Sequence, residues 1–490
     1  MRHVLNKTLY IVLMLSGPLL MLPGLQAQEP LGTVSNAATV LRQAIERMPQ
    51  FTQEQKTWLR DAAASVGDRH SEWLQSMEPS LQLLYSAASI PDAHWGLPWE
   101  EDGFNTKLTH LGPIRDLVVM AQRHAEAQLP HRPNAFLKDQ FAALAAARHT
   151  GRDGPLISLL VEYALESRVV DALARHLLDL SDEALASLAD QWGNSPAGGD
   201  LRSAVAMEKT LGVDWFIKRI RQDMEEDQLG RTHASRARLT DGSDATSDAT
   251  LSRERSLADE LSVCAIIEIG GLPIQIGLET KGGDSFFLKL GQKKRGVELV
   301  SADYEREEAV LIKDGRATLV ELRSRQLVAL DFHVSEETLA KVFGPDMAKE
   351  LLESAGDAGV SPLAMIHETS ADFGRLVEAV SLPYDAFRQW QADFEEEIAL
   401  GNALTRQLLP NISGARKRAD VVQVRRQMLT TAIDIVRLGT TAADKSVDPF
   451  GSGCFVYREA PNGFELASAL TSHGKPVTLT VGIVRPKDIK

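Results

Sequence analysis

The sequence predicts a mainly α-helical protein with an inserted small β module and a C-terminal β-hairpin, α+β overall. Three observations predict this class. Apolar residues recur at helical spacing over about residues 34–224, and again over about 335–438. Between these ranges, over about 263–332, apolar and polar residues alternate as they do in half-buried strands. The same alternation returns in the tail at 448–490.

The composition is that of a globular protein, and it limits the partners. The chain has 490 residues, of which 44% are hydrophobic and 24% charged, enough for two to four domains. Its net charge of −14 argues against a nucleic-acid partner, because phosphates would repel the surface. Two basic clusters, at 293–295 and 416–418, are interpreted as solvated faces. The predicted organisation is a signal peptide (1–27), a helical domain (28–229), a polar linker or loop (230–256), the small β module (257–332), a helical region (333–443) and a C-terminal β segment (444–490).

The N-terminus predicts export. Arg2, His3 and Lys7 precede an apolar stretch at 9–22, and the small residue Ala27 follows it. This is the three-part pattern of a cleavable secretory signal, so we expect the mature chain in the periplasm or outside the cell. An uncleaved anchor is the alternative. No later segment is apolar over the ~20 residues that a membrane span needs, so we expect no span after cleavage.

Start and stop signals divide the first helical range into hairpins. Thr52 and Gln55 are the ends of a capping box, which begins a helix. Pro130 and Pro133 separate two further helices, and Ser181 caps another. The long helices are expected near 113–128, 136–149 and 156–178. Their short connections predict a helical-hairpin array.

The β module contains six candidate strands separated by short turns. Asp314 and Gly315, between two alternating runs, specify a tight hairpin. The strands are expected at 264–269, 273–277, 285–290, 297–300, 309–312 and 317–322. Six short strands of this kind predict a sandwich-like or barrel-like module. In the tail, strands are expected at 455–458, 463–467 and 477–481.

One group of residues is a candidate binding cleft. Two tryptophans, two carboxylates and a histidine lie close together in the sequence: Trp95, Trp99, Glu100, Glu101 and His110. Aromatic rings beside carboxylates are typical of sugar- or peptide-binding clefts, and paired carboxylates hydrolyse glycosides. The alternative is structural: an acidic loop before a helix, which its tryptophans fix to the core.

No other motif predicts a catalytic residue, a cofactor or a metal. His367 and Glu368 form half of a zinc-protease motif, but Ala371 stands where the second histidine would be. Cys264 and Cys454 can form a disulfide in an oxidising compartment. Two small buried side chains are the alternative for these cysteines.

Two β segments resemble components of envelope assemblies. Residues 285–322, with strands and a hairpin that has Gly315 at its tip, resemble the periplasmic homology-region domain of the inner-membrane platform protein of type II secretion. Residues 448–468, with Asp448-Pro-Phe-Gly451 and then a tyrosine strand, look like the C-terminus of a major pseudopilin. Pseudopilins carry acidic calcium ligands in the next loop. Here 472–475 contains no acid, so we expect no calcium.

The chain as a whole is similar to large exported bacterial proteins of unknown function, through residues 95–110, 149–178 and 402–464. The resemblances imply a scaffold that binds protein partners in the cell envelope and is associated with a secretion- or pilus-type assembly. The lack of catalytic motifs argues against an enzyme. Two alternatives stay open: an exported hydrolase or carbohydrate-binding protein that uses the cleft, and a lipid or ligand carrier built from the hairpins. The sequence does not determine the oligomeric state.

Overall fold

The computed structural model describes residues 36–60, 70–220, 261–267, 275–289, 292–303, 308–313, 316–321, 330–331, 336–358, 362–401 and 403–482. Within these ranges the protein is mainly α-helical with small antiparallel sheets, which confirms the predicted fold class. The predicted signal peptide and the predicted polar linker lie outside the described residues.

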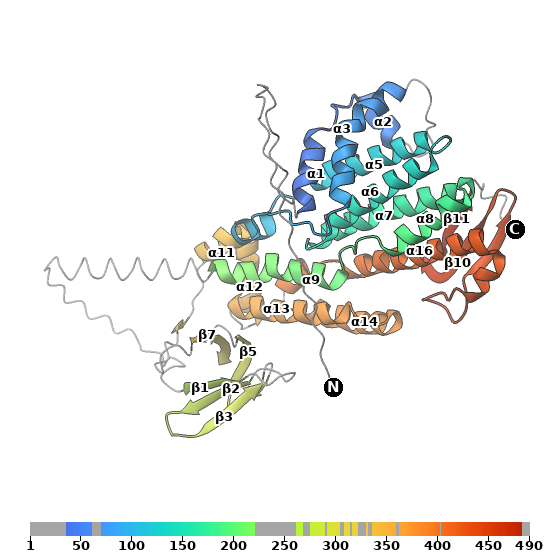
Figure 1. The fold of residues 1–490 in the computed structure, drawn as a ribbon. Helices are drawn as coiled ribbons and strands as arrows, with labels where there is room; N and C mark the ends of the chain where they lie inside the picture. The colour runs from blue at the N-terminus through green and yellow to red at the C-terminus, as the bar shows by residue number, and fades with distance from the viewer. Residues whose placement is uncertain are drawn as a thin grey trace, which may run out of the picture.

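The N-terminal helices form one layered body around a large apolar core (Figure 1). The predicted capping box begins α2: the Gln55 N–H donates to Thr52 Oγ1 at 3.3 Å, and Gln55 Oε1 accepts from the Thr52 N–H at 2.7 Å. Ser181 caps α8 as predicted, because its hydroxyl oxygen accepts from the Ala184 N–H. The helices of this body are α1 (Ala37–Glu46), α2 (Gln53–Arg60), α3 (Ser71–Ala88), α5 (Leu111–Gln128), α6 (Pro133–Gly151), α7 (Leu156–His176) and α8 (Asp182–Gly193).

A long helix, α16 (Ile412–Leu438), connects this body to the other helices. Its 27 residues span about 40 Å. Val424 and Met428, toward its C-terminal end, belong to the first core. Ala415 and Val422 belong to a second core with α7 and other helices. The other helices are α9 (Leu201–Lys209), α11 (Glu336–Phe343), α12 (Pro345–Ala358), α13 (Pro362–Ala379), α14 (Tyr384–Leu400) and α15 (Ala403–Leu408).

The β module has a core of its own. One sheet has the order β1 (Leu261–Ile267), β2 (Gln275–Thr280), β3 (Ser285–Lys289), and the other the order β4 (Lys293–Lys294), β5 (Val297–Asp303), β6 (Glu308–Lys313), β7 (Arg316–Glu321), β8 (Leu330–Asp331). Leu278, Leu288 and Leu311 are among the residues that fill the core between them. Each of the six predicted strands coincides, over its described residues, with one observed strand: β1, β2, β3, β5, β6 and β7. Lys313 pairs with Arg316, so β6 and β7 form the predicted hairpin.

The C-terminal segment is a three-stranded antiparallel sheet, one strand more than a simple hairpin. Its order is β11 (Lys475–Gly482), β10 (Gly463–Ser472), β9 (Val456–Ala460). Phe464, Leu466 and Leu479 are buried in the first core, where the sheet packs on α7 and α16. This packing makes the C-terminal sheet part of the helical body.

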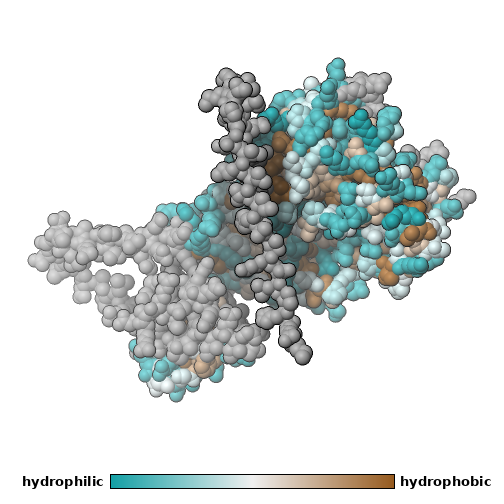
Figure 2. Space-filling view, in the orientation of Figure 1, coloured by the Kyte–Doolittle hydropathy of each residue, from teal (hydrophilic) through white to brown (hydrophobic). Residues whose placement is uncertain are grey.

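Polar residues cover most of the visible face of the helical body, with apolar residues scattered among them (Figure 2). None of the helices in the described ranges combines the length and the apolar character that crossing a bilayer requires.

Candidate functional site

The first tryptophan of the predicted cleft fixes its segment to the helical body. Trp95 is only 7% exposed, and its indole N–H donates to the His149 carbonyl oxygen at 3.0 Å. Its ring stacks on the His110 imidazole with centroids 4.1 Å apart, and the guanidinium of Arg42 lies 5.7 Å from its centroid. For Trp95, these contacts agree with the structural alternative.

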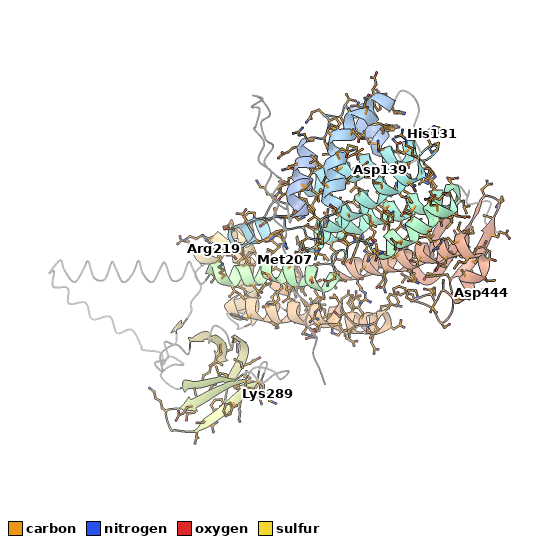
Figure 3. All side chains as sticks on the ribbon, in the orientation of Figure 1. His131, Asp139, Met207, Arg219, Lys289 and Asp444 are labelled. Carbon is orange, nitrogen blue, oxygen red and sulfur yellow. The ribbon has the colours of Figure 1, made fainter. Side chains whose placement is uncertain are left out.

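A cavity of about 270 Å³ lies beside this stack. Three of the five predicted residues line it, namely Trp95, Trp99 and His110. Met207 of α9, labelled in Figure 3, forms part of the wall. The two predicted carboxylates, Glu100 and Glu101, are exposed on the short helix α4 (Trp99–Asp102) and lie outside the lining. The structure therefore brings the aromatic residues and the histidine together, but not the acids.

The polar groups of this cavity are poorly arranged for acid–base catalysis. Burial, reinforced by the charge of Arg42, lowers the pKa of His110 to about 4, so its imidazole is neutral at pH 7. Asp153 is the one carboxylate among the described lining residues. It is 61% exposed and faces His94, with 3.5 Å between Oδ2 and Nδ1. Glycoside hydrolysis needs two carboxylates on opposite sides of the bond, and this lining supplies one.

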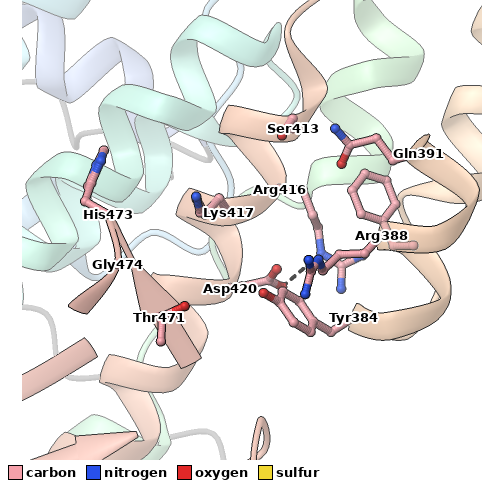
Figure 4. Close-up of a pocket in the computed structure, with 11 residues that line it drawn as sticks. Tyr384, Arg388, Gln391, Ser413, Arg416, Lys417, Asp420, Thr471, His473 and Gly474 are labelled. Atoms are coloured by element: carbon pink, nitrogen blue, oxygen red, sulfur yellow. Dashed lines mark hydrogen bonds and ion pairs between the residues drawn. The ribbon is translucent and has the colours of Figure 1, made fainter. Parts of the chain in front are cut away.

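A second pocket, of about 230 Å³, was not predicted from the sequence. It forms where α14, the first turns of α16 and the β10–β11 turn meet (Figure 4). Arg388, Arg416, Lys417 and His473 contribute basic side chains to its lining. The spacing of Arg416 and Asp420, four residues apart on one helix face, is the signal that was available in the sequence.

Arg416 corrects the interpretation of residues 416–418 as a solvated face. Its side chain is only 13% exposed, and its Nε donates to Asp420 Oδ1 at 2.9 Å. Its Nη1 donates to the carbonyl oxygens of Val380 and Leu382, each at 2.9 Å. Arg416 is thus a structural residue that closes the end of α13 onto α16, whereas Lys417 remains exposed.

Buried ionic groups connect α6, α7 and α16. Glu166 is fully buried and accepts from Arg148 Nη2 at 2.9 Å and from Arg426 Nε at 2.6 Å. Glu162, one turn earlier, is also fully buried, and its Oε2 accepts from the Gly199 N–H at 2.8 Å. Burial raises the pKa of Glu162 to about 8. This cluster is enclosed by the helices, so we assign it to the architecture.

The Asp-Pro-Phe-Gly segment at the start of the pseudopilin-like region is held by its aspartate. Asp448 is 3% exposed, and its Oδ1 accepts from the Phe450 N–H at 3.0 Å. Its carboxylate also accepts from the Ser468 hydroxyl at 2.9 Å and from the Ala469 N–H at 2.7 Å. The aspartate therefore fixes this loop to β10, a structural role.

The structure describes the side chain of one of the two cysteines, Cys454. Cys454 has an exposed thiol, which donates to the Asp444 carbonyl oxygen at 3.1 Å. The alternative of a buried side chain is therefore wrong for Cys454. The side chain of Cys264 lies outside those that the structure describes, so a disulfide between the two cysteines stays a prediction.

Within the described ranges, no three histidine, cysteine, aspartate or glutamate side chains are placed to hold a metal ion. Comparisons with family models, with curated proteins and with solved structures find no match for this chain.

Proposed function

We propose that the protein is an extracytoplasmic scaffold that binds protein partners in the cell envelope, beside a secretion- or pilus-type assembly. The observation that carries the proposal is an exposed apolar side chain on a terminal strand of each β unit. Phe287 on β3 is 48% exposed, and Val456 on β9 is 54% exposed. Both strands end their sheets in the described residues.

A terminal strand presents unpaired N–H and C=O groups, to which a partner protein can add a strand. Charged side chains on an edge discourage such pairing. β4, at one end of the larger sheet, has this protection in Lys293 and Lys294, which are both exposed. β3 and β9 each carry one exposed charged residue, Lys289 and Glu459. They also present Phe287 and Val456, so these two edges are less protected than β4 and suit a partner strand.

A surface groove supports the same proposal. It has a volume of about 540 Å³ and lies between α5, α7 and the start of α16. Ile157, Leu160 and Val161 make much of its lining apolar, and Ile157 is 50% exposed. Arg115 and Arg418 also line it. An apolar segment flanked by acidic residues would fit this combination.

The alternative of an exported hydrolase is less well supported than binding. Apart from the cavity beside Trp95, the helical body has a buried aspartate–histidine pair, with 2.7 Å between Asp139 Oδ2 and His124 Nδ1. The hydroxyl beside it belongs to Tyr85, which donates to Asp139 Oδ1. Burial and this hydrogen bond raise the pKa of Tyr85, so its hydroxyl is a poor nucleophile. Carbohydrate binding without hydrolysis remains the second candidate, since Trp99 lines the cavity.

The test is co-purification of the tagged full chain from gently crosslinked envelopes, with bound proteins identified by mass spectrometry. We expect secretin, platform or pilin-like proteins, and we expect Phe287→Lys or Val456→Lys to reduce their capture several-fold. Phe104→Lys is the matched control, because Phe104 is 62% exposed but lies on neither sheet. Capture that both strand variants leave unchanged, or an absence of such partners, would refute the proposal.

A further inference from the structure

The pocket between α14, α16 and the β10–β11 turn contains a buried carboxylate oxygen with an unmet hydrogen-bonding capacity. Asp420 is 2% exposed. Its Oδ1 accepts from Arg416, but its Oδ2 has no hydrogen-bond donor in the described part of the chain. A buried acceptor without a donor costs free energy, so such an atom in a pocket wall is a position that a donor group on a ligand can fill.

The other ionisable side chains at the mouth of the pocket are mainly basic. Asp420 is the one acid among the lining residues, and Arg416 already neutralises it. Arg388 and Lys417 are exposed at the pocket, and His473 lies on the turn beside it (Figure 4). The uncompensated positive charge of Arg388 and Lys417 favours a ligand with an anionic group.

Neutral polar groups and aromatic rings complete the lining. Gln391, Ser413 and Thr471 supply an amide and two hydroxyls, and Tyr384 and Phe387 supply the rings. Rings that cover the apolar face of a ligand, with hydroxyls and an amide around its edge, suit a molecule with several hydroxyl groups. The pocket, at about 230 Å³, exceeds the roughly 150 Å³ cavity that holds one benzene molecule, so a single sugar ring fits.

We propose that this pocket binds a sugar acid of monosaccharide size, with its carboxylate at Lys417 and Arg388 and a hydroxyl donating to Asp420 Oδ2. This site goes beyond the proposed scaffold function and does not depend on it. The carboxylate is held by cations at the mouth, which are exposed to solvent. The hydroxyl donates to the Asp420 carboxylate, whose position is fixed by its hydrogen bond from Arg416. Asp420 therefore provides the discrimination between a sugar acid and a simple anion.

The test is isothermal titration calorimetry of the full chain with three probes. These are D-glucuronate, D-glucose (which lacks the carboxylate) and acetate (which lacks the hydroxyls). We expect D-glucuronate to bind at least about tenfold more tightly than either other probe, a difference of ~1.4 kcal/mol. No binding of D-glucuronate at about 10 mM, or binding no tighter than that of acetate, would overturn the proposal.

Three variants assign the two contacts. Lys417→Gln should weaken the binding of D-glucuronate at least about tenfold. Arg418 is the adjacent exposed cation, and Arg418→Gln should leave this affinity unchanged. An equal loss in both variants would mean non-specific attraction and would contradict the site. Asp420→Asn should weaken the binding of D-glucuronate but leave the binding of acetate unchanged, because acetate has no hydroxyl group to donate a hydrogen bond to Oδ2. Because Asp420 also accepts a hydrogen bond from Arg416, thermal unfolding must show that the Asp420→Asn variant is folded. If that variant does not fold, the comparison of Lys417→Gln with Arg418→Gln decides whether the site exists.

Discussion

Glu162 shows how burial changes the chemistry of one side chain. It is fully buried on α7, 3.8 Å from the nearest guanidinium nitrogen of Arg426, while its Oε1 has no hydrogen-bond partner in the described residues. Glu166, one turn further along α7, accepts hydrogen bonds from both arginines of the cluster, Arg148 and Arg426. Because the charged form of Glu162 is poorly solvated and poorly paired, burial raises its pKa to about 8.

The raised pKa predicts a loss of stability as the pH rises from about 5 to about 8. An acid whose pKa rises from 4.5 to about 8 on folding stabilises the folded state fully below about pH 4.5, and this contribution is lost as the pH rises through about 8. We expect the free energy of unfolding to fall by up to a few kcal/mol between about pH 5 and 8. Glu162→Gln should flatten this decline in urea titrations across that range. Glu101→Gln, at an exposed position, is the control, and an equal decline in all three proteins would contradict the assignment.

His110 predicts the opposite pH dependence, a loss of folding stability in acid. Its pKa is about 4 in the folded chain against an ordinary value of 6.5. The stability that follows from its neutral form is present above pH 6.5 and is lost as the pH falls through about 4. His110→Phe keeps a ring against Trp95 and cannot titrate, so its stability should decline less over this interval. Urea titrations check this, with the exposed His131→Phe as control; a decline as large as that of the parent would disprove it.

At the level of elements, the turn between α8 and α9 depends on glycine. A Cβ added at Gly199 would lie 2.4 Å from the carbonyl oxygen of Gly151, at the end of α6. That carbonyl is backbone and has little freedom to move. We expect Gly199→Ala to destabilise the protein by about 2 kcal/mol or more, measured by urea unfolding. Gly193→Ala, with nothing within 4 Å of the added carbon, should be neutral or slightly stabilising, and equal effects would be evidence against this packing.

The elements themselves were predictable because their signals are local. Thr52 and Gln55 are three residues apart, and the hydrogen bonds between them form as the sequence predicts. The same holds for the pairing of β6 with β7, which two adjacent residues, Asp314 and Gly315, predict in the sequence.

The candidate sites were only partly predictable because they depend on contacts between distant segments. Trp95, Trp99 and His110 are close in sequence, and they do share a cavity. Glu100 and Glu101 are as close, yet the direction in which α4 turns leaves them exposed. The pocket around Asp420 combines α14, α16 and the β10–β11 turn, and nothing local in the sequence connects these three segments.

At the scale of the whole molecule, the apolar residues fall into separate cores. The first core joins the N-terminal helices, the C-terminal end of α16 and the last sheet, so residues from both ends of the described chain stabilise one body. The core of the β module contains only residues of its own strands. Its contacts with the helices include those of β5 and β7 with α13. Among the described residues, Ile312 of β6 is the module's apolar side chain that packs against a helical core. So small a shared apolar contact means weak coupling between the two unfolding equilibria.

We therefore expect more than one thermal transition in differential scanning calorimetry. Leu288→Ala removes a fully buried side chain from the β core, and Met428→Ala removes one from the first helical core. Each substitution should cost about 2–5 kcal/mol within its own unit. Leu288→Ala should lower the midpoint of one transition and Met428→Ala that of another, because each unit buries its own apolar surface. If both variants instead lowered a single shared transition by similar amounts, the β module would be unfolding with the helices, and its contacts with α13 would couple the two units strongly.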